Sequence, residues 1–196
     1  GTTGATLRGA TQTSVNGGNI TDARLSGAGV TASNYNAGGP GANSGNLGVT
    51  FTVGSAGVLA PLAGQVVNLR SNFSDIPDQK LNIVLGAGAA AYNVAVGSAA
   101  PSPVTVANQR VGGTTTQALT ISNTAPGGAF TEGLNAAFTG TTLQANTNGG
   151  SVALLAGGAS NNTAMRVGVD TSSAGAKAGS VTLGYQSDGA DTPGLA

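Results

Sequence analysis

The sequence of 196 residues contains no cysteine, no histidine and no tryptophan. Zinc fingers and iron–sulfur clusters need cysteine or histidine ligands, so neither kind of metal centre can form here. Ser-His-Asp triads and Cys-His dyads are excluded for the same reason. We expect neither an enzyme nor a protein with a cofactor.

Charge is also scarce, at 7% of residues against about 25% in an average soluble domain. Seven basic residues balance seven acidic ones, which gives a formal net charge of +0. A neutral chain without a basic surface is not typical of nucleic-acid binding. We therefore expect no nucleic-acid partner.

Long hydrophobic runs are missing as well. The nearest to a membrane segment is residues 81–96, which is interrupted by Asn82 and Asn93 and is short of the roughly 20 residues that a spanning helix needs. We expect no membrane span. The first residues, Gly1 to Gly4, have neither the basic start nor the apolar run of a signal peptide. This predicts either a leader already removed or an internal fragment.

Glycine is abundant, with 34 residues, and short β-prone runs alternate with turn-forming pairs. In the run 117–122, Leu119 and Ile121 share one face, and Thr120 and Ser122 share the other. A period of two is the mark of a half-buried strand. No long stretch shows a helical period, so we predict an all-β sandwich fold. The predicted strands are residues 66–69, 81–85, 91–96, 117–122 and 180–185.

An internal repeat divides the chain. Residues 17–22 (GGNITD) match residues 127–132 (GGAFTE) at an offset of 110, and later pieces recur in the same order with a small drift. We predict two tandem immunoglobulin-like β-sandwich domains over residues 1–96 and 104–196. Residues 97–103, with small side chains and two prolines, are the predicted linker.

The second half resembles a known family in a series of short motifs. In this order, the motifs resemble the bacterial choice-of-anchor D repeat domain, and the similarity is looser over residues 1–96. The resemblance implies an immunoglobulin-like β-sandwich from a large secreted or surface-anchored bacterial repeat protein, and no catalytic residues. The motifs are residues 104–113 (VTVANQRVGG), 117–124 (QALTISNT), 130–135 (FTEGLN), 167–175 (VGVDTSSAG) and 187–189 (SDG).

Candidate site residues are few. The acids closest in sequence are the pairs Asp75 and Asp78, and Asp188 and Asp191, which lie among turn-forming residues. Their side chains are expected to cap local turns, and a calcium site is the weaker alternative, because no Asp-x-Asp-x-Asp-Gly loop is present. Tyr35, between two asparagines on a predicted Gly-flanked loop, is the candidate for an exposed ligand contact.

Two functions are consistent with these features. We prefer a structural role as a stalk, scaffold or filament subunit at the bacterial cell surface, outside the cell. The alternative is an adhesin module that binds a glycan or a partner protein through loops such as residues 33–46.

The ends of the two copies suggest how neighbours would join. At the offset of 110, Gly1 matches Val111, so the first copy lacks a counterpart of residues 101–106, the predicted opening strand. The second copy lacks counterparts of residues 79–96, the predicted closing strands. A sandwich without a strand exposes unpaired backbone groups and an apolar groove. We therefore expect β-pairing with neighbouring copies or flanking repeats, in a filament or a longer chain.

Overall fold

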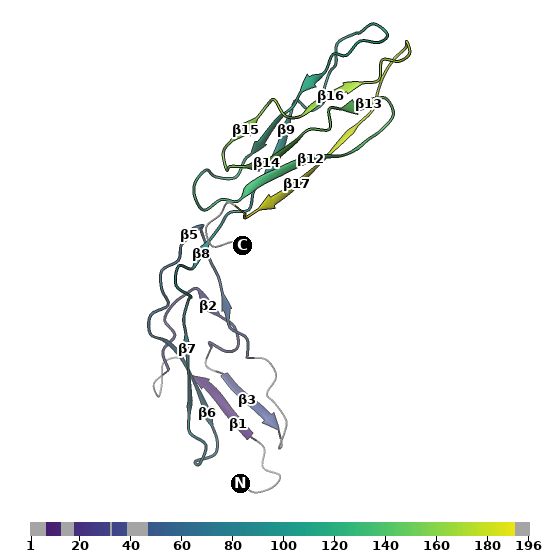
Figure 1. The fold of residues 1–196 in the computed structure, drawn as a ribbon. Helices are drawn as coiled ribbons and strands as arrows, with labels where there is room; N and C mark the ends of the chain where they lie inside the picture. Colours follow the sequence, from purple (N-terminus) through teal and green to yellow (C-terminus); the bar gives the residue numbers. More distant parts are fainter. Residues whose placement is uncertain (1–6, 13–17, 32, 39–46, 191–196) are drawn as a thin grey trace. The chain divides into compact units, whose positions relative to one another are not determined.

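The computed structural model describes residues 7–12, 18–31, 33–38 and 47–190. These residues form an all-β structure of short strands and turns, without an α-helix (Figure 1). No helix in this part of the chain is long and apolar enough to cross a membrane. The chain divides into two compact units. The first contains Gly1–Gly54 and Val58–Ala89, and the second contains Ser55–Gly57 and Ala90–Ala196.

The first unit is organised by one antiparallel sheet in the order β3-β1-β6-β7. A second pair of strands, β2 and β4, joins Leu25 to Phe51. The small core beneath them contains Leu25, Val30, Leu62 and Val67. The strands are β1 (Leu7–Gln12), β2 (Leu25–Ser26), β3 (Ser33–Gly38), β4 (Thr50–Phe51), β6 (Gln65–Ser71) and β7 (Gln79–Ile83). The short strands β5 (Gly57–Val58) and β8 (Ala90–Ala91) form a separate two-stranded sheet, of which Gly57, Ala90 and Ala91 belong to the second unit.

The described residues of the second unit form three antiparallel sheets of three strands each, in the orders β14-β12-β17, β15-β11-β9 and β10-β16-β13. Strand β12 pairs with β17 along eight register positions, and the two lie side by side in Figure 1. The strands are β9 (Gly97–Ala100), β10 (Gln117–Ala118), β11 (Thr120–Asn123), β12 (Gly133–Thr141), β13 (Ala145–Thr147), β14 (Ser151–Leu155), β15 (Ser160–Asn161), β16 (Arg166–Val169) and β17 (Val181–Asp188).

One core serves all three sheets of the second unit. Ile121 of β11 and Met165, just before β16, are fully buried, and Leu134 of β12 is 1% exposed. Leu119 is also buried, so the prediction that Leu119 and Ile121 share the core face is confirmed. Thr120 and Ser122, on the other face, are half-buried. The alternation of apolar and polar residues in this run therefore predicted correctly which side chains enter the core.

Most of the predicted strands are present. Residues 66–69 lie in β6, and β7, β10, β11 and β17 contain most of three others. The predicted strand 91–96 is wrong, because only Ala91 of this segment belongs to a strand, β8. Its backbone groups instead bond to separate partners: Asn93 to Phe130 and Glu132, and Ala95 to the Ser187 side chain. Such scattered partners leave no continuous ladder.

The predicted linker 97–103 is also wrong for its first four residues. Residues Gly97–Ala100 form β9, which pairs with β11 over four register positions inside the second unit. The units divide earlier, between residues 89 and 90. The small side chains that suggested a linker have a packing role, because a Cβ atom on Gly97 would meet the Tyr185 ring at 2.4 Å. Residues 101–106, the predicted opening strand, belong to no strand.

The two units differ in the topology of their described strands. At the offset of 110, β1 matches the β10–β11 segment. In the sheet, however, β1 lies between β3 and β6, whereas β11 lies between β15 and β9. The matched acids also have different partners, since Asp22 pairs with Arg24 and Glu132 accepts a hydrogen bond from Ser187. The all-β class is therefore observed, and the equivalence of the two copies stays a prediction.

Candidate functional site

Tyr35 does not lie on a loop. It belongs to β3, where it is the register partner of Gly9 in β1. The flanking asparagines favour turns by themselves, but pairing with β1 continues through both of them and overrides that preference. The proposed ligand loop 33–46 thus begins as a strand, and residues 39–46 lie outside the described part of the chain.

The predicted acid pairs are distributed over separate turns. Asp75 is exposed in a turn. The Asp78 carboxylate accepts one hydrogen bond from Asn68 Nδ2 and forms an ion pair with Arg70 Nε at 3.3 Å. The Asp188 carboxylate accepts bonds from the Ala190 N–H at 2.9 Å and from Asn135 Nδ2 at 2.7 Å. Asp191 lies outside the described residues. In the described ranges, no group of three or more acidic side chains gathers to hold a metal ion.

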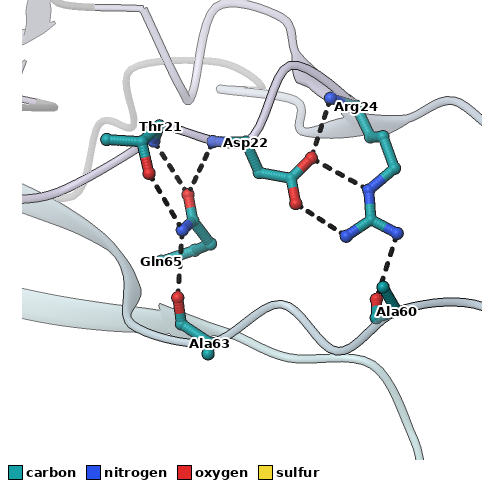
Figure 2. Close-up of polar contacts among 6 residues, drawn as sticks. All are labelled: Thr21, Asp22, Arg24, Ala60, Ala63 and Gln65. Carbon is teal, nitrogen blue, oxygen red and sulfur yellow. Dashed lines mark hydrogen bonds and ion pairs between the residues drawn. The ribbon is translucent and has the colours of Figure 1, made fainter.

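A polar cluster in the first unit surrounds Asp22 (Figure 2). Its carboxylate accepts three hydrogen bonds from Arg24, donated by the backbone N–H, Nε and Nη2, at distances of 2.6–3.0 Å. The guanidinium also donates to Ala60 O and lies 5.2 Å from the centre of the Phe51 ring. Gln65 completes the cluster, because its Oε1 accepts the N–H groups of Thr21 and Asp22. These bonds connect the segment before β2 to the start of β6, so we assign the cluster a role in holding the fold together.

The side-chain bond from Arg24, supported by the Arg24 backbone N–H, lowers the pKa of Asp22 from 3.8 to about 2. A depressed pKa stabilises the folded state above the unfolded pKa, and this contribution disappears as the pH falls through the folded value. We expect the free energy of unfolding of the first unit to fall as the pH is lowered from about 4 to about 2. In the variant Asp22→Asn, the part of this fall that comes from Asp22 should be absent. Urea unfolding across this interval, followed by circular dichroism, measures the difference.

Two variants check the assignment to this ion pair. Arg24→Gln should weaken the pH dependence as Asp22→Asn does, because it removes the partner that lowers the pKa. Arg110→Gln, which removes an exposed cation in the second unit, should keep the pH dependence of the wild type. Equal pH dependence in Asp22→Asn and the wild type would contradict the assignment.

A fully satisfied asparagine holds one end of the second unit together. Asn123, at the end of β11, is 1% exposed. Its Oδ1 accepts the N–H groups of Val96 and Ala125 at 3.1 and 3.2 Å. Its Nδ2 donates to the carbonyls of Glu132 and Leu155 at 3.1 and 3.0 Å. One side chain thus joins the segment before β9 to β12 and β14. Sequence reasoning missed it, because an Asn at a strand end is typical of an ordinary turn.

A groove of about 1100 Å³ opens along one flank of the second unit. One wall is β17 with the preceding residues 173–180, and the other is the segment 101–111, which contains no strand. The floor is apolar and is made by the buried Leu119 and Val167 with the half-buried Val181 and Leu183. Val104 packs against the same core from the opposite wall. The groove therefore reaches the interior between the sheets.

The described lining of the groove is mostly uncharged. Among the described residues that line it, Arg110 and Lys177 are the charged ones, and none is a carboxylate. Tyr185 lines it near β9, and burial raises the pKa of its hydroxyl, which therefore stays protonated at neutral pH. Neutral backbone, hydroxyl and aliphatic groups suit recognition of a peptide better than catalysis. None of the family models, curated proteins and solved structures compared with this chain matches it.

Proposed function

We propose that this chain is a structural segment of a bacterial secreted or cell-surface protein. It acts as a stalk, scaffold or filament subunit outside the cell, built from tandem immunoglobulin-like β-sandwich domains. Neighbouring copies or flanking repeats join it by β-strand pairing. The observation that carries the proposal is the open groove beside β17, a strand that pairs only with β12 among the described strands.

An open strand edge is normally covered or blunted, because it offers unpaired backbone groups to other chains. Strand addition uses such edges, and a head-to-tail contact of this kind propagates without closing. The neutral composition supports the same role, since 7% charged residues provide little for charged ligands to recognise. The sequence resemblance to a bacterial repeat domain is a further, independent support.

The experiment is a size measurement over a range of concentrations. We expect sedimentation velocity to show association of the chain as its concentration rises through the micromolar range. Amide exchange at Val181 and Leu183 should be fast in the dilute chain and slow in the associated form. A monomer at every concentration, with both amides already protected, would contradict the proposal. Binding on a glycan array together with that result would favour the adhesin alternative.

A further inference from the structure

We propose that the groove of the second unit binds one extended peptide strand of a partner protein, which pairs with the free edge of β17. The strand has small or β-branched residues at alternate positions and a carboxylate near its C-terminal end. This inference rests on the proposed function, because it names the place and the chemistry of the joint between neighbours.

The backbone of β17 supplies the first argument. Just before the strand, Ser180 directs its backbone toward β12, since its C=O accepts the Thr142 N–H at 2.9 Å and its N–H donates to the Thr142 hydroxyl at 2.9 Å. Strand residues alternate in the direction of their backbone groups. The N–H and C=O groups of Val181, Leu183 and Tyr185 therefore point away from β12, toward the groove. Another extended backbone can pair with the whole series at once and replace the water that otherwise solvates it.

The groove floor supplies the second argument. The side chains of Val181 and Leu183 enter the core on the groove side, and Val104 packs against that core from the opposite wall. An inserted strand would place every second side chain on this floor and leave the others facing solvent. Because the floor is aliphatic, those inward side chains should be apolar, and valine or alanine suits the pleat of a strand.

The two ends of the groove set its length and polarity. Beyond Tyr185, the Ala95 N–H donates to the Ser187 hydroxyl at 2.7 Å, so the chain before β9 covers the last part of β17. The Tyr185 ring lies against Gly97 and borders the groove there. At the other end, Lys177 lies four residues before β17 begins, and the turn 110–113 that contains Arg110 is hydrogen-bonded to Thr171 of the same preceding segment. The described lining contains these two cations and no carboxylate, since Asp170, which interacts with Lys177, is not a lining residue. This favours an acidic residue in the occupant at that end.

Antiparallel pairing determines which end of the partner strand is acidic. Strand β17 runs from Val181, at the Lys177 end, toward Tyr185. A strand antiparallel to it therefore has its C-terminal end beside Arg110 and Lys177. A small apolar molecule would fill the floor but would leave the backbone groups of β17 without partners, so we favour a peptide.

The test uses the full chain at a concentration where it is monomeric. The probe is a capped nine-residue peptide that alternates threonine with valine and ends in aspartate, labelled for fluorescence anisotropy. We expect saturable binding and, in hydrogen exchange followed by NMR, at least about tenfold slower exchange at Val181, Leu183 and Tyr185. The amides of Gly184 and Gln186, which face β12, should change little. Uniform slowing or no slowing would overturn the proposal.

Control peptides and variants test each contact separately. Replacing two of the valines by proline removes backbone donors and should abolish binding. Replacing the aspartate by lysine, or making Lys177→Glu in the chain, should weaken the affinity about fivefold, as expected for an exposed charge pair. Lys80→Glu is the matched control outside the groove, and it should bind as the wild type does. Equal binding of the proline peptide would contradict strand pairing.

The outcome of the peptide experiment can be distinguished from the outcome of the test of the proposed function. If the chain associates with itself but the peptide neither binds nor slows that association, the structural role stands and the groove assignment is wrong. If the peptide binds with the alternating exchange pattern while the chain remains monomeric, the groove assignment stands, and the donor strand belongs to another protein.

Discussion

We expect Asn123→Ala to lower the free energy of unfolding of the second unit by about 4 kcal/mol, because each buried polar group left unpaired costs about 1–3 kcal/mol. The side chain is 1% exposed and makes four hydrogen bonds to backbone groups. Alanine leaves two N–H groups and two carbonyls without these partners. Chemical denaturation, followed by circular dichroism, measures the loss.

Asn123→Asp is the sharper variant, because it keeps the shape of the side chain. At neutral pH it replaces the two N–H bonds of Nδ2 by a carboxylate oxygen that faces the carbonyls of Glu132 and Leu155. We expect it to be destabilised more than Asn123→Ala. Asn162→Ala, at an exposed position, is the matched control and should change stability by less than about 0.5 kcal/mol. Equal stability of Asn123→Ala and this control would show that the four bonds contribute nothing net.

The variant Ile121→Ala should lower the free energy of unfolding by a comparable amount, because it removes a fully buried side chain from the core of the second unit. Removing a core isoleucine costs about 2–5 kcal/mol, because apolar contacts are lost and the surrounding residues fill the cavity only in part. Leu119→Ala, on the same face, should fall in the same range. Urea unfolding of the purified variants measures both changes.

The neighbouring residue on the opposite face is the control. Ser122 is half-buried, and its hydroxyl forms a hydrogen bond with the Ser160 hydroxyl at 2.7 Å. Ser122→Ala should therefore cost well under 2 kcal/mol, as is usual away from a packed core. Equal tolerance of Ile121→Ala and Ser122→Ala would contradict the packing of β11.

The predictions that failed share a physical cause. Residues 97–103 have the composition of a linker, but Gly97–Ala100 pairs with β11, and the missing side chain of Gly97 makes room for Tyr185. Tyr35 has the neighbours of a turn residue, but β1 pairs along its strand. In both cases, a strand from elsewhere in the chain supplies backbone partners that local propensity does not anticipate.

The sequence by itself determined the all-β class, the absence of cysteine and histidine chemistry, and the buried face that contains Leu119 and Ile121. These properties depend on composition and on a period of two, which are local. Only the tertiary structure decided that Asn123 is buried with four partners and that β17 faces a groove. Burial of an amide and the pairing of a strand edge depend on residues distant in sequence, and only the folded backbone brings these together.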